Sequence, residues 1–220
     1  MEKILDNFKK IVYNVYEARS HYRKPDDEIR IMAVTKTQSP ENVNIAIDGG
    51  ITLLGENRVQ EFLSKRDSYK PAEVHFIGAL QTRKVRQIVP LVSMIHSVDS
   101  VKLLNEIDKV SRENDIVSDI LIEVNIGGEI SKSGVKPGEV HDFAEQAAEF
   151  KGLRLRGLMT IPPPENSDKY FGAMQELFEN LKSKYSLDTL SMGMSGDYIN
   201  AVRYGSTLIR IGSALFGARE

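Results

Sequence analysis

The stretch Ile29-Arg30-Ile31-Met32-Ala33-Val34-Thr35-Lys36, followed by Ser39-Pro40-Glu41, decides the fold class of this chain. Its first part is a mostly apolar run, which predicts a buried strand. The serine and proline predict a helix start, because serine caps helix N-termini and proline fits the first helical position. Gly49-Gly50 predicts the end of that helix. The stretch is therefore one strand–helix unit of an α/β protein.

The same strand–helix pattern repeats along the rest of the chain. Further strands are predicted at residues 52–55, 74–78, 94–98, 119–125, 153–159, 190–194 and 207–211. Strands that alternate with helical segments predict a parallel sheet. Eight such units in a chain of this length favour a closed (β/α)8 TIM barrel, with an open doubly wound sheet as the alternative.

An extra helix is predicted before the first strand. Apolar residues recur there at helical spacing, namely Ile4, Phe8, Ile11, Val12 and Val15. We expect residues 1–20 to form an amphipathic helix that covers the bottom of the barrel. The length of 220 residues suits one domain, so residues 1–220 are expected to form a single-domain barrel.

Composition excludes several functional classes. The absence of cysteine excludes disulfides, thiolate metal sites and cysteine nucleophiles. A formal net charge of −2 gives no reason to expect nucleic acid or an anionic membrane as a partner. The first 20 residues lack the apolar core of a signal peptide, and no apolar run reaches the ~20 residues of a membrane helix. We therefore expect a cytoplasmic protein, and a monomer.

The histidines do not form a recognisable metal site. All four lie in different strand–helix units without metal-ligand spacing: His21, His75, His96 and His141. His75 and His96 fall within apolar strands, so each is interpreted as a hydrogen-bonded structural histidine in preference to a ligand. The stretch 128–134 resembles a P-loop, but its glycine and lysine are in the wrong order.

In a (β/α)8 barrel the functional site lies at the carboxyl ends of the strands, so polar residues there are the candidates. These are Lys36, Glu56 with Asn57, Gln81, Ser97 with Asp99, Asn125, Met159 with Thr160, Ser195, and Arg210 to Ser213. A lysine desolvated by the barrel walls would have a lowered pKa and a nucleophilic amine. The alternative is a solvated lysine in a loop, and the residues alone leave the two equally open.

The last two strand ends are suited to an anion. Ser195-Gly196 and Gly212-Ser213 each precede a short helix, and small residues there let backbone N–H groups approach a phosphate. Barrels often bind phosphate after strands seven and eight. The alternative is that Ser195 and Ser213 are ordinary N-caps. Arg210, within the apolar last strand, either contacts a bound cofactor or forms a structural ion pair with Glu56 or another carboxylate.

These motifs closely resemble those of the pyridoxal phosphate homeostasis family. The matching stretches are Ala33-Val34-Thr35-Lys36, Gly55-Glu56-Asn57-Arg58, His75-Phe76-Ile77-Gly78, Ser131-Lys132-Ser133-Gly134, Leu190 to Asp197, Arg210-Ile211-Gly212 and Phe216-Gly217-Ala218-Arg219. They follow one another in order over essentially the whole chain. The resemblance implies a fold-type-III barrel, related to the N-terminal domain of alanine racemase.

The resemblance also implies the cofactor, pyridoxal 5′-phosphate (PLP), and the roles of individual residues. It implies that Lys36 holds PLP as an internal aldimine and that Ser195, Gly212 and Ser213 bind its phosphate. It further implies that Arg210 faces the pyridine nitrogen and that Asn57 lies near the ring. The role of Lys132 stays open: a lysine in such a loop is usually a solvated surface residue, and the alternative is a second contact to an anion.

Two functions are compatible with such a site. The first is PLP buffering or delivery without turnover, in which apo-enzymes that use PLP are candidate recipients. The second is a small amino-acid racemase. Related racemases take a second base, a tyrosine, from a C-terminal β-domain, whereas this sequence stops at Glu220 after the eighth unit. An arginine opposite the ring nitrogen also makes the ring a weaker electron sink. The homeostasis function is therefore favoured.

Overall fold

A computed structural model describes residues 2–217, so Met1 and the last three residues of the expected domain lie outside the described residues. The strands are β1 (Arg30–Val34), β2 (Leu53–Glu56), β3 (Glu73–Phe76), β4 (Met94–Val98), β5 (Ser118–Glu123), β6 (Leu153–Met159), β7 (Thr189–Met194) and β8 (Leu208–Ile211). The helices are α1 (Glu2–Tyr22), α2 (Pro40–Asp48), α3 (Val59–Lys65), α4 (Val85–Ile88), α5 (Val101–Glu113), α6 (Val140–Ala148), α7 (Ser167–Tyr185), α8 (Tyr198–Arg203) and α9 (Ser213–Phe216). Short 3₁₀ segments are η1 (Arg66–Ser68), η2 (Thr82–Lys84), η3 (Val89–Leu91) and η4 (Pro137–Glu139).

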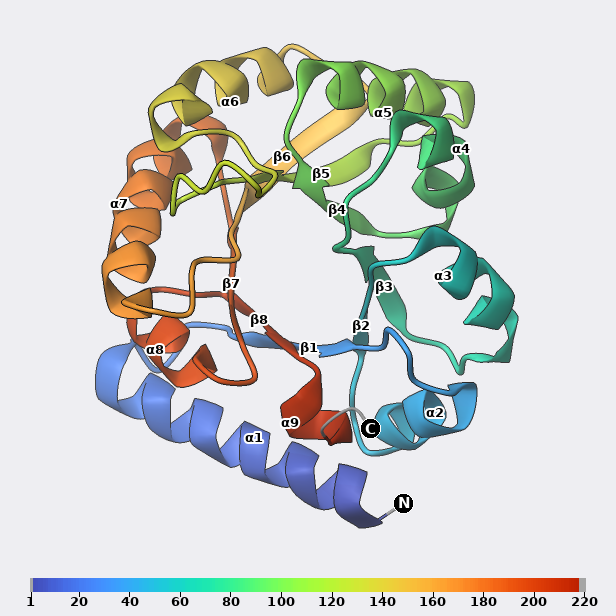
Figure 1. Cartoon of the computed structure of the whole chain (residues 1–220), viewed down its shortest axis with the longest axis vertical. Coiled ribbons are helices and arrows are strands. Elements are labelled where there is room, and N and C mark those ends of the chain that lie inside the picture. The colour runs from blue at the N-terminus through green and yellow to red at the C-terminus, as the bar shows by residue number, and fades with distance from the viewer. Residues whose placement is uncertain (1, 218–220) are drawn as a thin grey trace.

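The strands form a closed parallel barrel in sequence order, with helices around it (Figure 1). β1 pairs with β8 and aligns Met32 with Arg210, which closes the ring. The predicted (β/α)8 barrel is thereby confirmed, and the open sheet is excluded. Ser39 caps α2 by accepting from the Asn42 N–H, as predicted.

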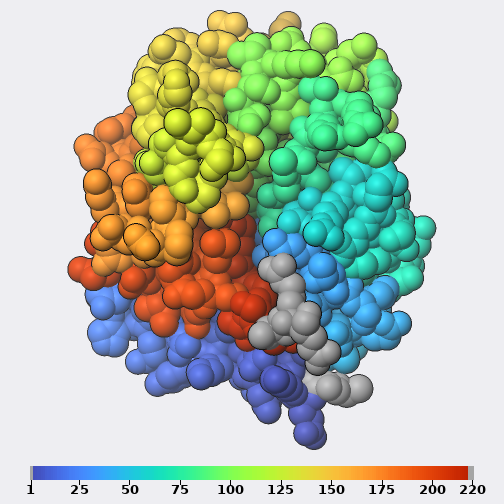
Figure 2. Space-filling view, in the orientation of Figure 1, coloured from blue at the N-terminus to red at the C-terminus, as the bar shows by residue number. Residues whose placement is uncertain are grey.

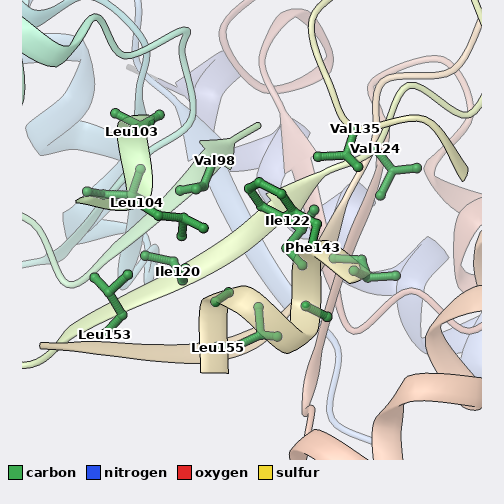
Figure 3. Close-up of a cluster of buried hydrophobic side chains, with 14 of the residues drawn as sticks. Val98, Leu103, Leu104, Ile120, Ile122, Val124, Val135, Phe143, Leu153 and Leu155 are labelled. Atoms are coloured by element: carbon green, nitrogen blue, oxygen red, sulfur yellow. The ribbon is translucent and has the colours of Figure 1, made fainter. Parts of the chain in front are cut away.

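Alternation along the strands separates two cores, because successive side chains point to opposite faces of a strand. The outer core lies between strands and helices, and Figure 3 shows the part of it formed by β4, β5 and β6 with α5 and α6. The inner positions include two small clusters made only of strand residues, namely Met32, Leu53 and Leu208, and Met94, Leu121 and Met159. His75, His96, Ser191 and Arg210 share the inner face, since their strand neighbours belong to the outer core.

The N-terminal helix is present but does not cover the bottom of the barrel as expected. α1 packs beside the barrel wall against α2, α8 and α9 (Figure 1). Its buried residues Ile4, Ile11 and Val15 join a cluster that contains outward-facing residues of β1 and β8. The apolar stripe of a helix specifies that one face is buried, but it does not specify the partner.

No helix within residues 2–217 combines the length and the apolar character needed to cross a membrane.

Candidate functional site

Lys36 lies in the short loop after β1, two residues beyond the end of the strand at Val34. This loop is held by α3. The Thr37 N–H donates to the Glu61 carboxylate, and the Lys65 amine donates to the Gln38 carbonyl at 2.6 Å. Burial alone would raise the pKa of Glu61, but hydrogen bonds from Lys65 and Thr37 outweigh it and lower the pKa. A fixed carboxylate therefore anchors the backbone next to Lys36.

A cavity of about 330 Å³ opens at the carboxyl ends of the strands. All six predicted cofactor-binding residues line it: Lys36, Asn57, Ser195, Arg210, Gly212 and Ser213. They come from the ends of β1, β2, β7 and β8. The half-buried Lys36 thus shares one cavity with a buried cation and with the amides after β8.

The Ser195 hydroxyl links the loops after β7 and β8. Its Oγ accepts hydrogen bonds from the N–H groups of Gly212 and Ala214, each at 3.1 Å. The alternative that both serines are ordinary N-caps does not hold, because Asp197 and Gly212 are the N-cap residues of α8 and α9. Ser195 instead caps α9 from the neighbouring loop. With its oxygen accepting twice, its hydrogen is available to an anion in the cavity.

Arg210 is 3% exposed and hydrogen-bonds to neutral groups. Its Nη1 donates to Ser191 Oγ at 2.7 Å, and its Nη2 donates to the Thr160 carbonyl at 2.8 Å. Burial lowers its pKa to about 10, against the opposing effect of Asp197 and Glu123. The suggested ion pair with Glu56 is not formed, and within residues 2–217 no carboxylate pairs with this guanidinium. A buried cation without a direct ion pair is costly, so a bound anion or acceptor would stabilise it.

Glu56 and Asn57 are neighbours in sequence, but only Asn57 lines the cavity. Its Oδ1 is buried and has no hydrogen-bond partner among the described residues. Glu56 points to the outer side of the barrel, where its Oε1 accepts from Thr35 and Tyr69 at 2.7 and 2.8 Å. Burial raises the pKa of Glu56 despite these hydrogen bonds. The other predicted strand-end candidates that do not line this cavity are Gln81, Ser97, Asp99, Asn125, Met159 and Thr160.

Glu56→Gln is expected to change how stability depends on pH. A raised pKa means that the folded state favours the neutral acid, so wild-type stability falls as pH rises above the ordinary value of 4.5. The glutamine variant lacks this loss, so its stability relative to wild type should increase with pH. Urea unfolding across the acid to neutral range measures the trend. Glu61→Gln is the control, because the lowered pKa of Glu61 predicts the opposite trend.

Four apolar residues of the cavity wall were not predicted as site residues: Val34, Ile77, Ile161 and Met194. Ile161 and Met194 are unusually exposed for such residues, at 40% and 37%. Ile161 lies two residues after β6 and Met194 is the last residue of β7, so their place at strand ends is a usable signal. Polar character does not reveal such residues.

The loop after β5 reaches over the rim of the barrel (Figure 1) and forms a raised part of the surface in Figure 2. Lys132 lies in it, is exposed, and pairs with Glu129 at 2.5 Å. It does not line the cavity. His75 and His96 are hydrogen-bonded to each other inside the barrel, which confirms their structural interpretation. Within residues 2–217 no group of three or more acidic, histidine or cysteine side chains is placed to hold a metal ion.

The fold and the site define a barrel of the alanine racemase N-terminal type, and the model of the family "Alanine racemase, N-terminal domain" matches residues 7–220. More narrowly, the chain belongs to the pyridoxal phosphate homeostasis protein family. A protein of that name from Aquifex aeolicus is 39% identical over 223 residues, covering 98% of each chain.

Solved structures agree with this assignment. PipY of Synechococcus elongatus, solved with PLP bound, is 27% identical with a TM-score of 0.83, and the match covers 98% of this chain and all of that one. A structure from Bifidobacterium adolescentis, described as an unknown protein, is 29% identical with a TM-score of 0.91 and is covered to 94%. The match spans 97% of this chain.

Proposed function

We propose that this chain binds PLP in the cavity, attached through the Lys36 amine, and that it buffers or delivers the cofactor inside the cell. One observation carries the proposal: Lys36, Arg210 and the capped amides after β8 meet around a single cavity. The names of the curated relatives and the PLP-bound PipY structure support the choice of ligand.

The groups present fit PLP. When bound, the cofactor supplies an aldehyde that an amine can attack, and Lys36 is the amine in the cavity. The phosphate carries roughly two negative charges near neutral pH, which suits Ser195 and the N-terminus of α9. Arg210 would donate to the ring nitrogen and keep it unprotonated, since arginine stays charged. Asn57 Oδ1 offers an unused acceptor.

The attachment point can be tested directly. Protein loaded with PLP, reduced with borohydride and digested should yield one modified peptide, with the added mass on Lys36. An adduct on another residue, or none, would overturn the proposal. Before loading and digestion the protein is expected to be a monomer, which light scattering checks.

Ser195→Ala is expected to weaken PLP binding by about tenfold, because a hydrogen bond to a charged group contributes roughly 1.5–3 kcal/mol. Equilibrium titration followed by absorbance measures this. Pyridoxal without its phosphate is the matched ligand, and its affinity should be the same for variant and wild type. Equal losses for both ligands would contradict a phosphate role for Ser195.

Buffering and delivery differ from catalysis in what the loaded protein does next. We expect the loaded protein to activate a PLP-dependent apo-enzyme and to show no amino-acid turnover at enzyme rates. The second candidate, a weak racemase, is favoured by the name of the matching family model. Incubation with single enantiomers of common amino acids decides between them. Racemisation above about one turnover per second would replace the homeostasis proposal with the racemase.

A further inference from the structure

A continuous chain of hydrogen-bonded polar groups, buried except at its half-exposed first member, crosses the barrel from its amino end to Arg210. It begins at Glu73 and passes through His75, His96 and Ser191. These residues belong to β3, β4 and β7, so the contact between His96 and Ser191 spans the barrel interior. His75, His96 and Ser191 are fully buried.

The Glu73 end, together with two neutral histidine rings, fixes the direction of the hydrogen bonds in the chain. Arg210 can only donate, and the Glu73 carboxylate can only accept. Hydrogen bonds from His75 and Arg30 lower the pKa of Glu73 to about 2, so this end remains an acceptor. Ser191 Oγ could accept from both Arg210 and His96, so Arg210 alone does not set the direction. When both rings are neutral, His75 donates to Glu73 and accepts from His96, and His96 in turn accepts from Ser191.

This rule assigns each proton. Arg210 donates to Ser191 Oγ, and the Ser191 hydroxyl then donates to His96 Nδ1 at 3.2 Å. His96 Nε2–H donates to His75 Nδ1 at 2.9 Å. His75 Nε2–H donates to Glu73 Oε1 at 2.6 Å. Each neutral histidine therefore carries its single proton on Nε2. A second proton on either ring would make His96 Nδ1 a donor to Ser191 Oγ and would place a second buried cation near Arg210.

We propose that Glu73, His75, His96 and Ser191 form an orienting relay, which fixes the Arg210 guanidinium at the cavity and sets both histidines as neutral Nε2–H tautomers. The relay rests on the proposed function in one respect only, namely the effect of a fixed Arg210 on the binding of PLP. The four members are positioning residues, because none of them lines the cavity, whereas Arg210 does.

The surroundings keep the histidines neutral. The charged groups that face the pair are Glu73 of β3, Arg30 of β1, Asp119 of β5 and Arg210 of β8. Burial lowers the pKa of His75, although the hydrogen bond to Glu73 opposes this effect. The pKa of His96 is lowered further, mainly by burial and also by the nearby His75, Arg210 and Arg30. Neutral rings can link the cation to the distant carboxylate through aligned hydrogen bonds, which strengthen one another in a low dielectric.

The protein without cofactor gives the first test. Long-range ¹⁵N–¹H spectra should show both buried histidines as Nε2–H tautomers that do not titrate around neutral pH. The Arg210 guanidinium should give separate, slowly exchanging Nη–H signals. An Nδ1–H tautomer or a charged ring for either histidine would overturn the relay, whatever the protein binds.

Variants give the second test. His96→Phe keeps a ring of similar shape but breaks the relay, so the separate Nη–H signals of Arg210 should be lost and PLP affinity should fall about tenfold. His96→Gln retains an acceptor and a donor and should recover most of the loss. Ser97→Ala is the matched control, because Ser97 follows His96, is buried, and its Oγ has no partner among the described residues.

The outcomes separate the two proposals. Unchanged Arg210 signals in folded His96→Phe would overturn the relay while leaving PLP binding intact. Failure of the wild-type protein to bind PLP, with the predicted tautomers present, would overturn the proposed function while the relay stands. If His96→Phe does not fold, the tautomers of the wild-type protein still decide the proposal.

Discussion

Lys36→Ala is expected to abolish the borohydride-fixed PLP adduct and to lower PLP affinity by about 100-fold, equivalent to about 3 kcal/mol. The reason is chemical, because the cavity would keep its phosphate and ring contacts but lose the amine that attacks the aldehyde. Intact-protein mass spectrometry after reduction measures the adduct, and absorbance titration measures the residual affinity.

The control for this variant is Lys70→Ala. Lys70 is an exposed lysine paired with Asp48 at 2.6 Å, and it does not line the cavity. Its loss should leave both the adduct and the affinity unchanged. A stoichiometric adduct in Lys36→Ala would show that another amine carries the cofactor.

Gly157→Ala should destabilise the barrel by about 3 kcal/mol, the upper part of the range for overpacking. A Cβ on Gly157 would lie 1.7 Å from the Thr189 carbonyl oxygen and 2.7 Å from its carbon. These two residues are partners in the β6–β7 pairing, so the obstruction is backbone and cannot rotate away. The two strands would have to separate locally. Urea unfolding should show a midpoint shift of the corresponding size.

Gly138→Ala is the matched control for that substitution. A Cβ at Gly138 would meet nothing within 4 Å, so its effect on the unfolding midpoint should be small. A Gly157→Ala protein as stable as this control would mean that the β6–β7 pairing tolerates a wider separation than its geometry indicates.

The sequence predicts the barrel well because each strand–helix unit carries its own signals. The capping serine, the apolar strand and the closing glycines of the first unit are all local features. The position of Lys36 at the cavity could be predicted because its loop directly follows a strand whose end defines the functional face. The position of α1 could not be predicted from local features, because its one apolar stripe could pack against several different partners.

The site was harder to predict at the strand ends, because a shift of one residue moves a side chain to the opposite face of the strand. Glu56 and Asn57 both follow the second predicted strand, yet they lie on opposite sides of the barrel wall. Composition gives no strand register, so this pair could not be resolved from the sequence. The surroundings of Arg210 depend on residues contributed by β6 and β7, which are distant in the chain before the barrel closes.

Barrel closure has a consequence for the order in which the protein is made. β8 completes the ring against β1, and the Asn7 side chain donates to the Leu215 carbonyl of α9. During synthesis, β1 and Asn7 leave the ribosome before β8 and α9. A nascent chain whose β8 has not yet emerged has unpaired edges at β1 and β7, and it lacks Arg210, Gly212 and Ser213 of the cavity wall. The complete cavity therefore forms only when β8 closes the ring.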